Sequence, residues 1–144
     1  MLAEATLDQT AGLVGDDWVW KPTGPKKDGP PDPGAQLTLM NARVASLVAG
    51  DPERRALAGD QLYVDLDLSV RNVPPGTRLR VGSALIEVTA VPHRGCGKFT
   101  ARFGVDAMKF VNSKVGRELN LRGINARVVD GGTVRVGDLA EKLL

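Results

Sequence analysis

The sequence predicts a single domain, residues 1–144, that is mainly β with a few short helices. Three observations lead to this prediction. Short segments rich in apolar and β-branched residues recur along the chain, as is typical of strands. Turns rich in glycine and proline separate these segments. Two turn–strand–turn corners are alike, GTRLRVG at 76–82 and GTVRVG at 132–137, as expected in a small barrel.

The first part of the chain combines a weak strand signal with a segment that resists regular structure. Residues 12–20 predict a short strand around a glycine–aspartate turn. Residues 21–34 hold five of the nine prolines and few apolar side chains, so they predict a mobile surface loop. This loop is either a lid over a site or a tolerated insertion, and the general variability of surface loops favours an insertion.

A strand followed by two short helices is expected next. Residues 36–40 predict the strand. Asn41 can cap a helix, because its side-chain oxygen accepts an N–H of the first turn, and the apolar stripe of that helix ends at Gly50. Pro52 suits the first position of a second short helix, which ends at Gly59.

The middle of the chain is predicted to be β. Residues 61–64, 78–81 and 84–91 predict strands, with a turn over residues 72–77. The third of these strands is mostly apolar on both faces, which indicates an interior position in a sheet or barrel. Pro92 has no N–H to donate and is expected to end this strand.

The remaining chain predicts a helical segment and a closing hairpin. Residues 99–111 have helical spacing of their apolar side chains, interrupted by Gly104. Residues 124–129 predict a strand, and a hairpin-type turn at 130–132 joins it to a partner strand at 133–136.

The composition excludes several classes of protein. A net charge of +2 and an aromatic content of 4% argue against a nucleic-acid binder, which needs a dense basic face or stacking platforms. No apolar run approaches the roughly 20 residues of a membrane helix. The N-terminus carries acids and no basic, apolar leader, so it is not expected to be a signal peptide. A single cysteine cannot form an internal disulfide, which favours a reducing compartment, and we expect a cytoplasmic protein.

That cysteine, Cys96, lies in the segment VPHRGCGKF, residues 91–99. Gly95 and Gly97 let another molecule approach closely, and Arg94 and Lys98 supply positive charge. Cations and the N-terminus of the following helix both favour a thiolate, the form that acts as nucleophile or metal ligand. The alternative is a small buried hydrophobic side chain, because free cysteine is among the most buried residue types.

The only histidine, His93, stands three residues before Cys96. This spacing can place two ligands on one zinc ion, but no other cysteine or histidine completes the set, so we expect no zinc. A Cys–His catalytic pair is geometrically open, although no third, orienting group is evident. A partly exposed loop histidine without a role is favoured over both.

Further polar candidates lie near the predicted closing hairpin. Asn125 and Arg127 are two residues apart on a strand and share a face, and Arg122 precedes them. If that face is turned toward the cysteine segment, these side chains form an anion pocket with Arg94 and Lys98. If it is turned away, they are solvated surface residues.

Taken in order, several segments resemble the MOSC domain, which is named after the C-terminal domain of molybdenum-cofactor sulfurase. No single motif is highly specific, but the ordered set covers residues 12–138 and is most similar to stand-alone bacterial members. The matching segments are GLVGDDW (12–18), QLTLMNARV (36–44), AGDQLYVDLDLS (58–69), PPGTRLRVGSALIEVT (74–89), CGKF (96–99) and LRGINARVVDGGTVRVGD (121–138).

The resemblance implies a mixed β-barrel with a few short helices and a cysteine that ligates the molybdenum of a pterin cofactor or carries sulfur. Some relatives, supplied with electrons by redox partners, reduce N-hydroxylated bases and amidoximes. On this analogy Cys96 is the catalytic residue and the molybdenum ligand. The neighbourhood of that cysteine and the closing strand supply the expected cofactor-binding residues: Arg94, Gly95, Cys96, Lys98, Asn125 and Arg127.

The chain also departs from the family. Relatives usually have a further strand before the GLVGD segment, and only eleven residues precede Gly12, so the barrel is expected to lack an N-terminal edge strand or to start truncated. An open edge would invite pairing into a homodimer. Gly95 stands where relatives often have proline. No flavin or iron–sulfur segment is present, so a separate redox partner is expected, and no pyridoxal-phosphate lysine domain accompanies the cysteine.

Three functions remain open at this point, and with them whether the chain is an enzyme. The first is a molybdenum-dependent oxidoreductase component with Cys96 as metal ligand. The second is a sulfur carrier that receives a persulfide on Cys96 from a cysteine desulfurase. The third is a binding module that holds the pterin or an anion without chemistry. The first is slightly favoured over the second, and both over the third.

Overall fold

The computed structural model describes residues 2–21 and 29–144. Residues 22–28 of the expected loop over 21–34 lie outside the described residues. The prediction that this loop is a lid or an insertion therefore falls on residues that the structure does not describe. The described end of this segment contains a short 3₁₀ helix, Pro33–Ala35, in which Asp32 accepts a hydrogen bond from the N–H of Gly34.

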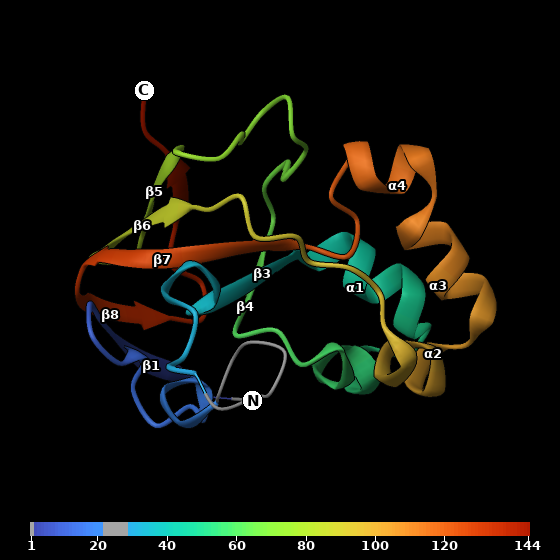
Figure 1. The fold of residues 1–144 in the computed structure, drawn as a ribbon, viewed down its shortest axis with the longest axis horizontal. Coiled ribbons are helices and arrows are strands. Elements are labelled where there is room, and N and C mark those ends of the chain that lie inside the picture. Colours follow the sequence, from blue (N-terminus) through green and yellow to red (C-terminus); the bar gives the residue numbers. More distant parts are fainter. Residues whose placement is uncertain (1, 22–28) are drawn as a thin grey trace.

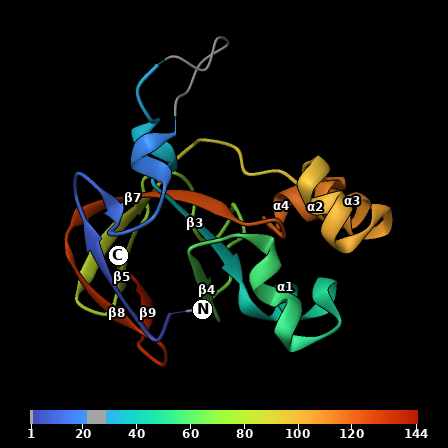
Figure 2. The ribbon, with the colours of Figure 1, turned by 90° about the horizontal axis from the view of Figure 1, so that it is seen from below.

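Two sheets form the body of the molecule and together make a nearly closed barrel (Figures 1 and 2). The larger sheet has the strand order β4-β3-β7-β6-β5-β9, and the smaller sheet has the order β2-β1-β8. The β3–β4 pair is parallel and the other pairs are antiparallel, so the fold is mixed. The strands are β1 (Glu4–Asp8), β2 (Gly12–Leu13), β3 (Leu37–Asn41), β4 (Leu62–Val64), β5 (Arg78–Val81), β6 (Ala84–Val88), β7 (Ile124–Asp130), β8 (Gly132–Arg135) and β9 (Ala140–Lys142).

Helices cover one end of this barrel, away from β1 and β8 (Figures 1 and 2). They are α1 (Ala42–Ala49), α2 (Gly97–Phe103), α3 (Val105–Asn112) and α4 (Lys114–Glu118), with a 3₁₀ helix at Pro52–Ala58. A further 3₁₀ helix, Trp18–Trp20, follows β2 on the other side of the molecule (Figures 1 and 2). Asn41 caps α1 as expected, because its side-chain oxygen accepts from the N–H groups of Arg43 and Val44. Gly104 separates α2 from α3, which confirms the predicted interruption.

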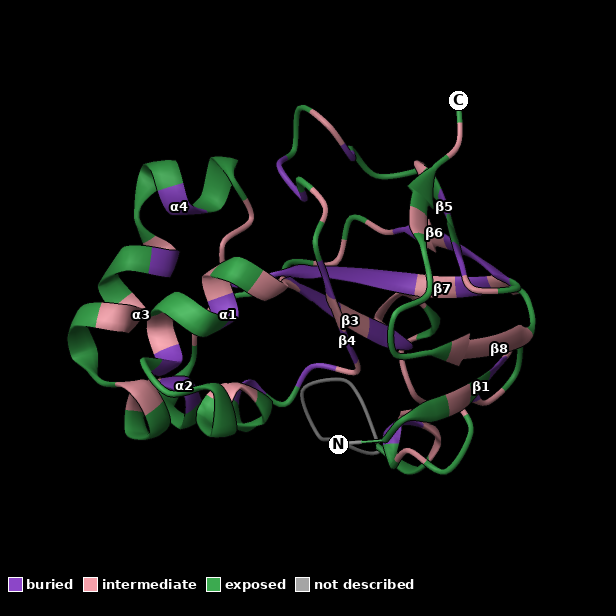
Figure 3. Cartoon of the chain, turned by 180° about the vertical axis from the view of Figure 1, so that it is seen from behind, coloured by how far each residue is buried: buried purple, intermediate pink, exposed green. Residues whose placement is uncertain are grey.

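The hydrophobic core fills the barrel. Strands β3, β6 and β7 contribute most of it, and Figure 3 shows β3 and β7 buried over most of their length. Their burial on both faces agrees with the apolar composition of residues 84–88. The most buried large side chains are Leu7, Leu37, Leu39, Met40, Leu68, Val73, Leu79, Ile86, Val111 and Val128. The prediction of a mainly β fold with short helices is confirmed.

The predicted closing hairpin is wrong. β7 and β8 are separated only by Gly131, and β8 pairs with β1 rather than with β7. One residue cannot close an antiparallel hairpin, which needs a loop of at least two residues. The glycine pair instead lets the chain pass from one sheet to the other at close range. A Cβ on Gly131 would lie 2.8 Å from the carbonyl oxygen of Leu7, and one on Gly132 would lie 2.6 Å from Oγ of Ser83.

Three strand boundaries also differ from expectation. A strand does precede Gly12, namely β1, so the barrel has the strand that its sequence seemed to lack. β6 ends at Val88 rather than at Pro92. The N–H of Thr89 still donates to the carbonyl of Asn125 on β7, but the Thr89 hydroxyl donates to the carbonyl of Gly34 and the ladder has no pair beyond Val88. β9, which was not predicted, pairs with the outer edge of β5.

Candidate functional site

The cysteine loop, defined as residues 89–96, carries the chain from β6 across β7 to the start of α2 (Figure 1). Two asparagine side chains hold it. Buried Asn125 on β7 donates from Nδ2 to the carbonyl of Val91 at 3.0 Å and to that of Pro92 at 3.3 Å. Asn112, at the end of α3, makes two hydrogen bonds of 2.9 Å with the backbone of Gly95, one donated and one accepted. The loop therefore has a defined path although it lacks regular secondary structure.

Cys96 occupies the N-cap position of α2 and is exposed, so the alternative of a buried, hydrophobic cysteine does not hold. Its side chain makes no capping hydrogen bond. The pKa of the thiol is nevertheless lowered, chiefly by the backbone N–H of Phe99. Burial is the next largest influence and opposes this shift, while the N–H of Lys98 and the charges of Arg122 and Lys98 add to it. The arrangement favours a solvent-accessible thiolate, the reactive and metal-binding form of cysteine.

A buried charge network lies beneath the cysteine loop. The side chain of Asp60 is fully buried and bonds two partners. Its Oδ1 lies 2.8 Å from Nε2 of His93, and its Oδ2 accepts a 2.7 Å hydrogen bond from Nη1 of Arg122. His93 therefore forms a hydrogen bond with a buried carboxylate, and it is not a loop side chain without a role.

Arg122 connects the same network to α2. Its guanidinium lies over the ring of Phe99, with Cζ 5.2 Å from the ring centroid, and its Nη2 donates to the carbonyl of Ala58 at 2.9 Å. The Nε of Arg122 is buried and has no hydrogen-bond partner among the described residues. His93 lies before Cys96 and Phe99 lies after it, so the Asp60–Arg122 pair anchors both ends of the segment that carries the thiol.

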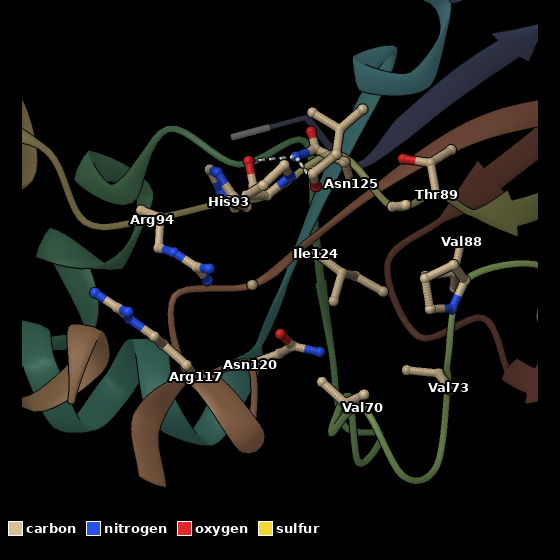
Figure 4. Close-up of a pocket in the computed structure, with 15 residues that line it drawn as sticks. Val70, Val73, Val88, Thr89, His93, Arg94, Arg117, Asn120, Ile124 and Asn125 are labelled. Carbon is tan, nitrogen blue, oxygen red and sulfur yellow. Dashed lines mark hydrogen bonds between the residues drawn. The ribbon is translucent and has the colours of Figure 1, made fainter. Parts of the chain in front are cut away.

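A cavity of about 230 Å³ borders the cysteine loop (Figure 4). Cys96 is not among its lining residues. The cavity is bounded by the cysteine loop, the segment before β5, the end of α4 and the start of β7. Its lining residues are Val70, Val73, Pro75, Val88, Thr89, Ala90, Val91, Pro92, His93, Arg94, Arg117, Asn120, Gly123, Ile124 and Asn125.

The structure brings together some of the predicted site residues and separates others. Arg94 and Asn125 line the cavity, whereas Cys96 and Lys98 lie at the start of α2. Gly95 is fixed between them by Asn112. Arg127 lies farther along β7, where its guanidinium pairs with Glu87 at 3.1 Å. The anion pocket predicted from the strand face therefore forms only in part.

Sequence reasoning missed Asp60, Arg117 and Asn120. Asp60 is one of 17 acidic residues, and nothing local marks it as the buried partner of a histidine 33 positions away. The one signal for a buried Asp60 is its position between the apolar residues Ala58 and Leu62, both of which are buried. Burial of an unpaired carboxylate there would cost much free energy, so a partner is expected. Arg117 and Asn120 lie near the end of α4 and reach the cavity only through the tertiary fold.

Two negative findings apply to the described part of the chain. No three side chains among its histidine, cysteine, aspartate and glutamate residues come together as a metal-binding group. None of its helices has the length and apolar character needed to cross a bilayer.

Comparison with known proteins identifies a family model and several similar folds. The model of the MOSC domain matches residues 36–141. No curated protein has a sequence that matches the chain. Among solved structures, YiiM from Escherichia coli superposes with a TM-score of 0.61 at 23% identity, and the match covers 98% of this chain and 62% of that one.

Two further structures agree with this fold. YiiM from Geobacillus stearothermophilus gives a TM-score of 0.62 at 14% identity, covering 99% of this chain and 62% of that one. YuaD from Bacillus subtilis superposes with a TM-score of 0.59 at 17% identity, and the match covers 98% of this chain and 85% of that one. The chain thus spans less than two thirds of the length of either YiiM structure. At these identities the likeness establishes the fold alone.

Proposed function

The chain belongs to the MOSC domain family, and from this premise we propose that it binds a molybdenum–pterin cofactor with Cys96 as the protein ligand of the metal. The observation that carries the proposal is the setting of Cys96. The thiol is exposed at the start of α2, and its pKa is lowered by the backbone N–H of Phe99 and by nearby positive charge. A metal ion binds the thiolate, so a lowered pKa favours metal binding at neutral pH.

The residues around Cys96 fit an anionic, sulfur-rich cofactor. Arg94 and Lys98 are exposed and have no carboxylate partner among the described residues, so their charge is available to phosphate or thiolate groups. A Cβ on Gly97 would meet no atom within 4 Å, which leaves open space beside the thiol. The charge of Arg122, although paired with Asp60, also lowers the pKa of the Cys96 thiol.

Cys96 would hold the molybdenum, while Arg94, Gly95 and Lys98 would contact the pterin or its phosphate. Asn125 and Arg127 support the proposal less directly. Asn125 already bonds the carbonyls of the cysteine loop, and Arg127 already pairs with Glu87.

When bound, the cofactor would supply a metal centre for two-electron reduction, which some MOSC relatives apply to N-hydroxylated compounds. This chain's own residues would position that centre. His93, Asn112 and Asn125 hold the path of the cysteine loop, and the backbone N–H groups in the first turn of α2 lower the pKa of the thiol. Electrons would come from a separate redox partner protein.

A sulfur carrier is the second candidate, and the exposure of Cys96 outside the cavity favours it. In this role the Cys96 thiolate attacks the outer sulfur of a cysteine-desulfurase persulfide. The desulfurase thiolate leaves, and the transferred sulfur forms a persulfide on Cys96. An accessible thiolate on a surface loop suits contact with a second protein.

Metal and pterin analysis distinguishes the candidates. The protein is purified from a molybdate-fed host shown to make the cofactor, and molybdenum and pterin are quantified per chain. Stoichiometric loading that is lost in Cys96→Ser, weakened in Lys98→Gln and unchanged in Lys109→Gln supports the molybdenum ligand. Metal-free wild-type protein from such a host refutes it.

A second measurement tests the carrier. The protein is incubated with a cysteine desulfurase and cysteine, and its intact mass is recorded. One added sulfur on wild-type protein, absent in Cys96→Ser, supports the carrier, and an unmodified thiol counts against it. Pterin retention that survives Cys96→Ala would instead indicate a binding module without chemistry.

A further inference from the structure

The cavity beside the cysteine loop has one charged end and one apolar end (Figure 4). Arg94 and Arg117 lie together at one end, and Val73 and Val88 lie at the other. Ile124 lies between the two ends. A site of this polarity suits a molecule that has a charged head and an apolar body.

Among the twelve arginines, four have neither a carboxylate partner nor a side-chain hydrogen bond within the described structure, namely Arg71, Arg80, Arg94 and Arg117, and of these only Arg94 and Arg117 line the cavity. Five others pair with carboxylates, namely Arg43, Arg78, Arg122, Arg127 and Arg135. Within the described residues, Arg94 and Arg117 have neither a carboxylate partner nor a side-chain hydrogen bond. Both arginines are exposed and lie on the same side of the cavity, so each can offer an unpaired guanidinium group to an anion there (Figure 4). Guanidinium also binds carboxylate and phosphate groups through paired hydrogen bonds.

The walls of the cavity are held in place by hydrogen bonds. On one side, the N–H of Val70 donates to the carbonyl of Glu118 at 3.0 Å, and Nδ2 of Asn120 donates to the carbonyl of Leu68 at 2.8 Å. On the other side, Asn125 holds the carbonyls of Val91 and Pro92. A site formed in advance loses little of its binding free energy to reordering.

We propose that this cavity binds a small organic anion. The carboxylate or phosphate head lies on Arg94 and Arg117, and a short hydrocarbon or ring body packs against Val73, Val88 and Ile124. The cavity volume of about 230 Å³ lies below the roughly 300–1,000 Å³ of sites for drug-sized ligands, so the ligand is of small-metabolite size. Cys96 does not line the cavity, so this binding does not require the cofactor, although the cavity shares Arg94 with the proposed cofactor site.

Nuclear magnetic resonance titration of the full chain tests the proposal at constant ionic strength. Sodium hexanoate and hexyl phosphate are the anionic probes, and hexanol, hexylamine and inorganic phosphate are the matched controls. We expect saturable shifts of the Asn120 and Gly123 amides with at least one anionic probe. The preferred probe identifies the head group. The proposal is overturned if hexanol saturates the amide shifts at the same concentration as the anionic probes. It is also overturned if inorganic phosphate binds as tightly as those probes, or if neither anionic probe gives saturable shifts.

Variants locate the site. Arg117→Gln is expected to weaken binding by about tenfold or more, as for the loss of a charge-assisted hydrogen bond. Arg71→Gln removes an exposed arginine beside Val70 that does not line the cavity, and binding should stay unchanged. Equal losses in these two variants overturn the assignment. Both arginines are exposed, so the fold should persist, and an otherwise unchanged amide spectrum verifies it. Retained binding in Cys96→Ser separates this site from the cofactor proposal.

Discussion

Arg122 donates a 2.7 Å hydrogen bond to the carboxylate of Asp60, and both side chains are withdrawn from solvent. The two residues are 62 positions apart in the chain. Their pair joins the start of β4 to the start of β7 beneath the cysteine loop. Because His93 bonds the same carboxylate, the pair links the core of the barrel to the candidate site.

Removal of the Asp60 charge should destabilise the protein strongly. Asp60→Asn leaves Arg122 buried without a counter-charge, and we expect a loss of about 3–5 kcal/mol in the free energy of unfolding. The exposed Arg43–Asp65 pair offers a matched control, because Asp65→Asn should cost about 1 kcal/mol or less. Urea denaturation measures both, and similar small losses would contradict the assigned role of Asp60.

His93 should act through the same carboxylate. His93→Gln is expected to cost about 1.5–3 kcal/mol, the usual range for a hydrogen bond to a charged group. The same substitution in an Asp60→Asn background should cost clearly less, because its partner is already altered. A double-mutant cycle of unfolding free energies measures this coupling. Equal losses in the two backgrounds would show that His93 acts independently of Asp60.

The reactivity of Cys96 should report its lowered pKa. Alkylation by iodoacetamide follows the thiolate fraction, so the midpoint of its pH profile in folded protein should lie below the unperturbed value of 9.0. In urea the N–H groups of α2 are no longer aligned and the midpoint should rise. Lys98→Gln should raise the midpoint in folded protein, whereas Lys109→Gln on α3 should not. A folded midpoint at or above that of the unfolded chain contradicts the prediction.

Gly123 should not tolerate a side chain. Its φ is +125°, and a Cβ there would collide with the carbonyl oxygen of Leu39 and crowd the ring of His93. Gly123→Ala is expected to cost about 3 kcal/mol through overpacking and backbone strain. Gly76→Ala is the control, because its φ of +93° gives strain alone in open space, and it should cost about 1 kcal/mol. Thermal and urea unfolding of both variants would reveal a difference, and equal costs would exclude the close contact.

Acid should weaken the ion pairs of Glu87. Burial alone would raise the pKa of this carboxyl, but hydrogen bonds and charges from Arg127 and Arg78 outweigh burial and lower it. The stabilisation is therefore present above the unfolded pKa, near 4.5, and is lost as the pH falls through the lower folded value. Glu87→Gln should flatten the fall in unfolding free energy below about pH 4.5, whereas Glu141→Gln on exposed β9 should leave it unchanged. Matching acid profiles for wild type and Glu87→Gln would argue against this origin.

Local patterns predicted local structure well. Asn41 identified the start of α1, Gly104 the break between α2 and α3, and the apolar run at 84–88 a buried strand. Each signal depends on a few neighbouring residues, so it survives without knowledge of the fold. The pairing of β8 was predicted wrongly, because a turn signal marks where a chain bends and not which strand it meets next.

The candidate site also has features that local sequence predicted and features that it did not. The glycines and cations around Cys96 are neighbours in sequence, and the structure keeps them at the start of α2. The resemblance to the MOSC domain, carried by the order of several segments, is confirmed by the family model over residues 36–141. The surroundings of Arg127 and His93 could not be predicted from neighbouring residues. Arg127 pairs with Glu87 from another strand, and His93 bonds Asp60 from another loop.

By itself, the sequence determined the mainly β class, the family and the glycines and cations around the single cysteine, because these follow from local propensity and from the order of motifs. Only the tertiary structure decided which charges lie buried together and which face an open cavity. Asp60 bonds Arg122 and His93, and Arg94 and Arg117 line one cavity, across separations that no periodic pattern spans. The physical reason is that the electrostatic interaction of a charged side chain depends on the groups within a few ångströms of it. In this barrel those groups come from strands and loops that are far apart in the chain.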